Sequence, residues 1–131
     1  MNKFSFSDKS EQILNTVKIE LNNLAHKVLE ISPIDFTVVD GWRDKKTQEK
    51  LYKENKTKTL NSKHCSGDAI DIVPFINEKP DYNAINDCAF IIGLFYAKAE
   101  ELGIKIRVGA IWDGNSISHN TFLDIWHIEL V

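Results

Sequence analysis

The sequence predicts a small α+β domain. Two stretches, at residues 11–31 and 83–102, repeat apolar residues at spacings of three and four, which is the period of an amphipathic helix. Short runs rich in β-branched residues lie between and after them and are typical of strands. A chain of 131 residues, 43% hydrophobic and 27% charged, is long enough for one packed core. We therefore expect residues 1–131 to form a single domain without an internal linker.

The first expected helix begins after Ser10, which favours the N-cap position, and ends near Ser32-Pro33. Its apolar stripe consists of Leu14, Val17, Leu21, Leu24 and Val28. Residues 36–39 (Phe-Thr-Val-Val) predict a strand, and the Asp-Gly pair after them predicts a turn. Arg43 therefore lies just beyond the end of a strand.

A shorter helix is expected over residues 45–54, with Gln48, Leu51 and Tyr52 close to one face. The polar residues 55–62 predict an exposed connection. This middle segment therefore offers few apolar residues to a core.

A second strand is expected over residues 69–73 (Ala-Ile-Asp-Ile-Val), where Asp71 faces away from the two isoleucines. Pro74 and Asn77 are expected to end this strand. A carboxylate on a strand otherwise suited to a core needs a cation or several hydrogen-bond donors. Asp71 is therefore a candidate for a functional site.

The C-terminal half predicts a long helix over residues 83–102, which Gly103 ends. Its expected stripe is Ile85, Ala89, Ile92, Tyr96 and Ala99. Strands are expected over residues 104–108 and 125–130.

Charge is distributed unevenly along the chain. The formal net charge is −3, yet residues 42–63 carry eight Lys and Arg against three Asp and Glu. Such a segment is either a solvated surface or a patch that faces an anionic polymer, and we expect no nucleic-acid partner. No apolar run approaches the roughly 20 residues of a membrane span, and the first residues lack a signal-peptide pattern. We expect Cys65 and Cys88 to be free thiols.

Four residues form a candidate metal and catalytic site. His64 stands in a polar loop seven residues before Asp71, and Asp124 precedes His127 by three residues. Two imidazoles and one carboxylate leave the fourth position of tetrahedral zinc open to water, as in catalytic sites. Taken singly, His64 could be a hydrogen-bonded loop residue, Asp71 a turn cap and Asp124 a local partner of His127.

The arrangement resembles a known group of zinc peptidases. Residues 62–71 read S-x-H-x-x-G-x-A-x-D, and residues 124–129 read D-x-x-H-x-E. This pair of motifs is similar to that of D-Ala-D-Ala carboxypeptidases, D-Ala-D-Ala dipeptidases and phage L-alanyl-D-glutamate endopeptidases, and the chain most resembles the short phage endolysins. The resemblance implies a small antiparallel sheet that carries the zinc site, packed with two long helices and one shorter helix, as in the hedgehog-type fold.

The resemblance also assigns roles. His64, Asp71 and His127 match the zinc ligands, and Asp124 matches the catalytic acid–base residue. Arg43 matches an arginine that contacts the substrate carbonyl and would stabilise the oxyanion. The alternative for Arg43 is an ion pair with a neighbouring aspartate.

Three further positions are candidates for supporting roles. Ser62 opens the first motif and is expected to help hold the substrate. Glu129 shares a strand face with His127 and is either a partner that orients this imidazole or an exposed carboxylate. Asp113 and Asn115 belong to a polar loop that would bind Ca²⁺ or simply cover the substrate.

These expectations combine into one hypothesis with two alternatives. We expect an endolysin that cleaves the L-alanyl-D-glutamate bond of peptidoglycan stem peptides, with Zn²⁺ as cofactor and Ca²⁺ as an optional regulator. The alternatives are a D-Ala-D-Ala carboxypeptidase or dipeptidase, and a non-catalytic zinc domain that binds a peptide or partner. We further expect a monomer without a separate wall-binding domain, held in the host cytoplasm until a holin-type protein permeabilises the membrane.

Overall fold

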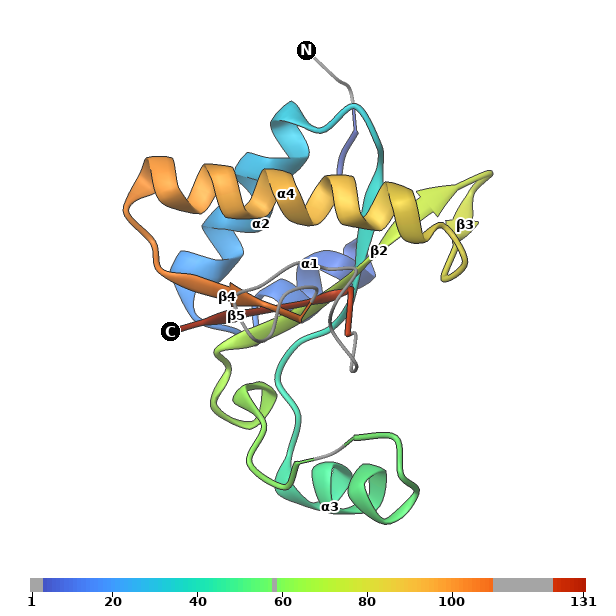
Figure 1. The fold of residues 1–131 in the computed structure, drawn as a ribbon, viewed down its shortest axis with the longest axis vertical. Coiled ribbons are helices and arrows are strands. Elements are labelled where there is room, and N and C mark those ends of the chain that lie inside the picture. The colour runs from blue at the N-terminus through green and yellow to red at the C-terminus, as the bar shows by residue number, and fades with distance from the viewer. Residues whose placement is uncertain (1–3, 58, 110–123) are drawn as a thin grey trace.

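The computed structural model describes residues 4–57, 59–109 and 124–131, and these form an α+β fold (Figure 1). Its α-helices are α1 (Asp8–Leu14), α2 (Ile19–Ile31), α3 (Lys45–Lys53) and α4 (Ile85–Leu102). A short 3-10 helix, η1 (Lys63–Ser66), precedes the central strand. The strands are β1 (Phe36–Asp40), β2 (Ala69–Ile76), β3 (Lys79–Pro80), β4 (Ile106–Val108) and β5 (His127–Leu130). None of the helices in these described ranges is long and apolar enough to cross a membrane.

The strands form one small antiparallel sheet in the order β1-β2-β5-β4, and β3 pairs with the far end of β2. Strand β2 is central, with Thr37 of β1 opposite Val73 on one side and Ile128 of β5 opposite Ile70 on the other. The α+β prediction is confirmed.

The hydrophobic core lies between one face of this sheet and the helices. Ile70 and Ile72 of β2 point into the core, and so do Val38 of β1 and Ile128 of β5. Helix α4 packs on β2 and β4, and α2 packs against α4 (Figure 1). Because side chains alternate along a strand, Asp71 points to the opposite face. The helices thus support the sheet from behind the face on which Asp71 lies.

We call the sheet together with α1, α2 and α4 the body of the molecule. A smaller region projects away from it. We define the α3 lobe as residues 41–57 and 59–68, which contain α3 and η1. Figure 1 shows that the chain leaves the body after β1, forms α3 at the far end and returns through η1 into β2. Apart from two glycines, the only buried residues in the described part of this lobe are Gln48 and His64.

The prediction of a single first helix is wrong, because this segment forms two helices, α1 and α2. Ser7, not Ser10, caps α1, and the buried Ser10 hydroxyl instead contacts the Thr37 hydroxyl of β1 at 2.8 Å. The break follows Leu14, where the Lys18 N–H donates to the Gly67 carbonyl instead of to a helical carbonyl. Tertiary hydrogen bonds therefore replace the helical ones that the apolar spacing favoured.

The end of β2 also differs from expectation. Strand β2 continues through Pro74 to Ile76 and turns at Asn77 and Glu78, which both have positive φ. Pro74 has no N–H to donate, and its carbonyl accepts a hydrogen bond from the Asp81 N–H at 2.8 Å.

The buried face of α4 is also rotated relative to the predicted stripe. Ile85 and Tyr96 are exposed, and the buried residues are Cys88, Ile91, Ile92, Phe95 and Ala99. Helix α4 ends at Gly103 in the left-handed conformation, as predicted. Cys65 and Cys88 are free, also as predicted.

Candidate metal centre

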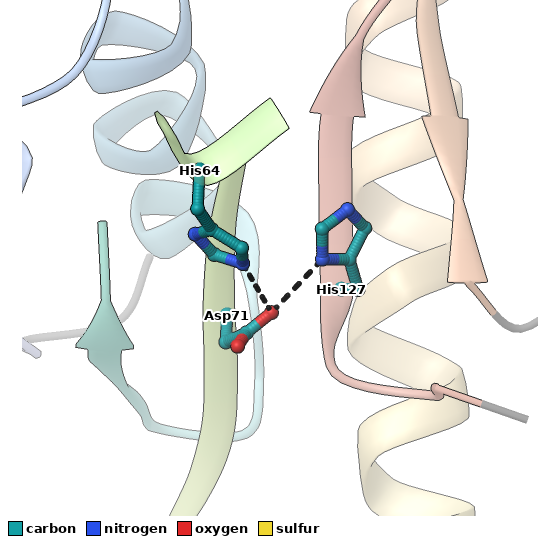
Figure 2. Close-up of side chains that lie close together, drawn as sticks. All are labelled: His64, Asp71 and His127. Atoms are coloured by element: carbon teal, nitrogen blue, oxygen red, sulfur yellow. Dashed lines mark hydrogen bonds and ion pairs between the residues drawn. The ribbon is translucent and has the colours of Figure 1, made fainter. Parts of the chain in front are cut away.

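Three donor atoms from three separate segments converge on the face of the sheet opposite the core. His64 comes from η1, Asp71 from β2 and His127 from β5 (Figure 2). The Asp71 Oδ1 atom lies 3.4 Å from His64 Nε2 and 3.2 Å from His127 Nδ1. One ligand atom from each residue lies within 4.8 Å of the other two. Both imidazoles are buried, and Asp71 is mostly so.

Sheet register and local capping explain this convergence. Asp71 and His127 are direct cross-strand partners in the β2–β5 pair, so their side chains leave the same face. His64 is set by η1, whose N-cap Ser62 accepts a hydrogen bond from the His64 N–H at 3.1 Å. Gly67 then ends η1 with φ +75°, a conformation that glycine adopts without strain.

Hydrogen bonds at the outer nitrogens orient both imidazoles. His64 Nδ1 lies 2.7 Å from the Gly41 carbonyl, to which it donates, and this leaves Nε2 as the atom that faces Asp71. His127 Nε2 lies 2.9 Å from Glu129 Oε1, and this leaves Nδ1 facing Asp71. A nitrogen whose ring partner donates a proton keeps its own lone pair in the neutral tautomer. Both inward nitrogens are therefore available to a cation.

The pKa shifts within the cluster show that a positive charge beside Asp71 is favourable. Burial opposes ionisation of Asp71, but hydrogen bonds from His127 and His64 outweigh it and lower the Asp71 pKa to about 2. Burial likewise opposes the charged form of His127, but hydrogen bonds to Asp71 and Glu129 raise its pKa to about 9. The positive charge that a protonated imidazole gives Asp71 could equally come from a divalent cation.

The donor set fits zinc better than calcium. Zinc accepts imidazole nitrogen and carboxylate oxygen in tetrahedral geometry, and bond lengths of about 2.0–2.1 Å place neighbouring ligand atoms roughly 3.3 Å apart. Two of the three separations, 3.2 and 3.4 Å, agree with that spacing, and all three ligand atoms lie within 4.8 Å of one another. Calcium prefers six or more oxygen ligands, whereas this cluster offers two nitrogens.

Asp124 lies beside the cluster. Its Oδ2 is 3.8 Å from His127 Nδ1, and 30% of the side chain is exposed to solvent. Burial, followed by repulsion from Asp71, raises the Asp124 pKa. Gly109 permits this placement, because a β-carbon there would collide with the Asp124 carbonyl oxygen. Asp124 is thus a solvent-accessible carboxylate at the edge of the three donors.

Arg43 is fixed on the α3 lobe by several polar contacts. Its guanidinium forms an ion pair with Asp40, and Nη1 donates to the Gln48 Oε1 at 2.7 Å. Its backbone N–H donates to the His64 carbonyl at 3.0 Å. The ion pair with Asp40 was the alternative expected for Arg43, but the arginine side chain is only 13% exposed, so this is not a loose surface contact. The Arg43 charge also lowers the Asp124 pKa, which opposes the effect of burial there.

Two residues support Arg43; Gln48 was not identified in this role from the sequence, and Asp40 was considered only as an alternative ion-pair partner. Asp40 holds the Arg43 guanidinium from one side, and Gln48, which is 1% exposed, holds it from the other while its Nε2 donates to the Thr59 carbonyl at 2.7 Å. Neither position belongs to a recognisable motif. The available signal was a glutamine on the inward side of a helix that has few apolar residues.

The remaining predicted residues fall into two groups. Ser62 lies at the start of η1 and Glu129 beside His127, so both adjoin the cluster. Asp113 and Asn115 of the expected calcium loop lie outside the described residues.

Comparison with known proteins gives a consistent result. A family model described as phage L-alanyl-D-glutamate peptidase matches residues 2–131. The L-alanyl-D-glutamate peptidase of Escherichia phage T5 is 40% identical over 136 residues, which covers 98% of each chain.

Two solved structures share the fold. The L-Ala D-Glu endopeptidase ChiX of Serratia marcescens matches with a TM-score of 0.83 and 25% identity, over 97% of this chain and 90% of its own. The vancomycin-resistance D,D-dipeptidase VanXYg, bound to a D-Ala-D-Ala phosphinate analogue, matches with a TM-score of 0.54 and 18% identity, over 88% of this chain and 50% of its own.

Proposed function

The chain belongs to the phage L-alanyl-D-glutamate peptidase family, and from this premise we propose that it is a zinc-dependent endolysin that hydrolyses the L-alanyl-D-glutamate bond of peptidoglycan stem peptides. The observation that carries the proposal is the convergence of His64, Asp71 and His127 with the carboxylate of Asp124 beside them. This combination provides a cation site and a separate proton acceptor, which are the parts that metal-assisted peptide hydrolysis requires.

His64 would hold the zinc through Nε2, Asp71 through a carboxylate oxygen and His127 through Nδ1. When bound, zinc supplies a Lewis acid that polarises the scissile carbonyl and makes water acidic enough to be a nucleophile at neutral pH. Glu129 would keep the His127 ring in the required orientation and tautomer through its 2.9 Å contact with Nε2.

Asp124 would act as the general base and then as the general acid. Its carboxylate is close to the cluster yet partly open to solvent, so it can accept a proton from the attacking water. It would then donate that proton to the departing amine of D-glutamate as the peptide bond breaks. Its raised pKa, caused mainly by burial, brings it nearer to the range in which a carboxyl group can perform both transfers.

Arg43 would stabilise the negative charge that develops on the carbonyl oxygen. The contacts with Asp40 and Gln48 limit rotation of its guanidinium, and a preorganised donor is more effective than one that must be ordered during the reaction. Ser62 would help to hold the substrate while its hydroxyl caps η1.

The proposal extends to where and how the protein acts. We propose that it is a monomer, accumulates in the host cytoplasm, and reaches peptidoglycan after a separate holin-type protein has permeabilised the membrane. Size-exclusion chromatography with light scattering and fractionation of cells expressing the chain with and without such a protein test these points.

The test of the activity is mass spectrometry of purified Gram-negative peptidoglycan after incubation with the zinc-loaded protein. We expect release of peptides that begin with D-glutamate, inhibition by a chelator and no release by the Asp124→Ala variant. Loss of a single D-alanine from the stem peptide would identify a carboxypeptidase instead, and hydrolysis of free D-Ala-D-Ala would identify a dipeptidase. A zinc-loaded protein that cleaves no muropeptide would indicate a non-catalytic binding domain.

A further inference from the structure

The outer face of α3 carries a stripe of lysines. Lys46, Lys50 and Lys53 follow one another at spacings of four and three, so they lie on one side of the helix. That side is opposite Gln48, whose side chain points into the lobe and is 1% exposed. All three lysines are exposed.

Positive charge exceeds negative charge around this stripe. Within the described ranges, none of the three lysines forms an ion pair. Lys46 does attract the Asp44 carboxylate, which also caps α3, and the exposed Glu49 lies on the same helix. Residues 42–63 therefore remain strongly positive in a chain whose net charge is −3. Such a patch attracts multivalent anions, while the rest of the surface repels them.

Two large aromatic side chains are exposed on the same lobe. Trp42 is 53% exposed and directly precedes Arg43. Tyr52 is 45% exposed and, four residues after Gln48, lies on the other side of α3 from the lysines. Exposed large aromatic side chains are frequent at interaction surfaces, and an excess of positive charge attracts polyanions. Here they lie on the region that also carries Arg43 and His64, so a partner held by the lobe is held close to the proposed active site.

Resting on the proposed function, we propose that the outer face of the α3 lobe is a docking surface for peptidoglycan beyond the scissile bond. Lys46, Lys50 and Lys53 would contact free carboxylates of neighbouring stem peptides. Peptidoglycan carries a carboxylate-bearing peptide at regular intervals, which suits a row of lysines better than a single anion does. The rest of the chain, with its excess of negative charge, would be kept away from this polymer, so the lobe approaches first.

The test compares two triple variants with the same net charge. The docking variant is Lys46→Gln, Lys50→Gln and Lys53→Gln. The control is Lys9→Gln, Lys79→Gln and Lys105→Gln, three exposed lysines outside the lobe that form no ion pair in the described part of the chain. Binding is measured by co-sedimentation with purified sacculi, using full-length zinc-loaded protein that also carries Asp124→Ala so that the polymer stays intact.

At low ionic strength we expect the docking variant to bind sacculi about tenfold more weakly, and the control to stay within about twofold. The salt dependence of binding should also flatten in the docking variant alone. With Asp124 restored, the docking variant should cleave a soluble disaccharide-tetrapeptide at the wild-type rate and sacculi more slowly.

Other outcomes overturn the proposal. Equal binding by both variants, or an equal loss in both, would show that the stripe is an ordinary solvated surface. Tighter binding to phosphatidylglycerol vesicles than to sacculi, lost in the docking variant, would show that the partner is a membrane. Failure of the wild type to cleave the soluble muropeptide would refute the proposed function itself, and this is a separate measurement from sacculus binding.

Discussion

The body of the molecule and the α3 lobe hold their functional residues by different means. In the body, Asp71 and His127 are fixed by strand register, and the sheet behind them rests on buried aliphatic side chains such as Ile72 and Ile128. In the described part of the lobe no apolar side chain is fully buried, and Arg43 and His64 are held by hydrogen bonds and an ion pair.

The difference indicates that stability and activity depend on different regions. Apolar burial dominates the free energy of folding, so the body should determine unfolding. Polar contacts contribute little net stability but impose directions, so the lobe should determine placement. The proposed zinc ligands come from both regions, and a bound ion would fasten the lobe to the body.

The largest effect is expected from removing a proposed zinc ligand from either the body or the lobe. His127→Ala in the body and His64→Ala in the lobe should each abolish measurable turnover and zinc binding, because two remaining ligands cannot retain the ion at ordinary concentrations. Turnover on a soluble muropeptide and the zinc content by elemental analysis measure these effects. A variant that keeps one zinc per chain would contradict the ligand assignment.

The same pair of variants separates the two regions in hydrogen exchange. In wild-type protein, adding zinc should slow exchange of backbone amides in residues 41–57 and 59–68 more than in β2 or α4, because the body is already held by its core. Both alanine variants should lose this response. Equal protection of the body and the lobe by zinc would show that the two regions unfold together.

The next largest effect concerns Asp124, which lies at the edge of the body. Asp124→Asn should lower turnover by about 10²- to 10⁴-fold, the range typical of a positioned acid–base group, while zinc binding is retained. Loss of zinc together with activity would mean that Asp124 is a ligand rather than a proton carrier.

A matched pair of truncations then tests the contrast directly. Ile128→Ala in the core should lower the free energy of unfolding by about 2–5 kcal/mol, the usual cost of truncating a buried isoleucine, and should leave kcat near wild type in the folded, zinc-loaded fraction. Gln48→Ala should lower kcat/KM by roughly tenfold through misplacement of Arg43, at a smaller cost in stability of about 1–3 kcal/mol. Urea unfolding and muropeptide kinetics measure both.

The opposite result for these two variants would contradict the difference between the body and the lobe. If Gln48→Ala unfolds the protein as readily as Ile128→Ala, the lobe is part of the cooperative core. Gln48→Glu provides a further check, since it keeps an oxygen acceptor for Arg43 but loses the N–H that donates to Thr59. It should therefore restore part of the lost kcat/KM if Gln48 acts by positioning the arginine.

The same contrast explains what could be predicted from the sequence. Helices and strands of the body follow from apolar periodicity, because that periodicity reports the surface that each element buries. The break between α1 and α2 did not follow, because it depends on the Ser10–Thr37 and Lys18–Gly67 contacts, which join residues distant in sequence. The face of α4 was also misjudged, since Tyr96 is apolar enough to fit a stripe yet is exposed.

Within the site, the motif residues and their neighbours Ser62 and Glu129 could be proposed from the sequence, whereas the supporting role of Gln48 could not. His64, Asp71, Asp124 and His127 are chemically distinctive residues in unusual positions. Gln48 is a common residue type, and its contact with Arg43 depends on the direction in which that arginine points. Hydrogen bonds that orient a side chain depend on the three-dimensional structure, so the spacing of residues in the sequence gives little indication of them.

The smallest effect concerns pH and the metal-free protein. His127 has its pKa raised from 6.5 to about 9 by its partners in the folded state, so the folded protein binds more protons than the unfolded one between these values. The contribution of His127 to stability is therefore complete below about pH 6.5 and is lost as the pH rises through 9. Its size is at most about 3 kcal/mol, because the shift is shared with Asp71.

Asp71 shows the opposite dependence. Its pKa is lowered from 3.8 to about 2, so its contribution is present above about pH 4 and is lost as the pH falls toward 2. With a chelator present, thermal unfolding should show greatest stability between about pH 4 and 6.5, and His127→Gln should remove the decline above that range. Zinc should reverse the alkaline trend, because the metal displaces the ring proton and binds more tightly as that proton becomes easier to remove. If the zinc-saturated protein still loses stability between pH 6.5 and 9, His127 is not a zinc ligand that connects the body to the lobe.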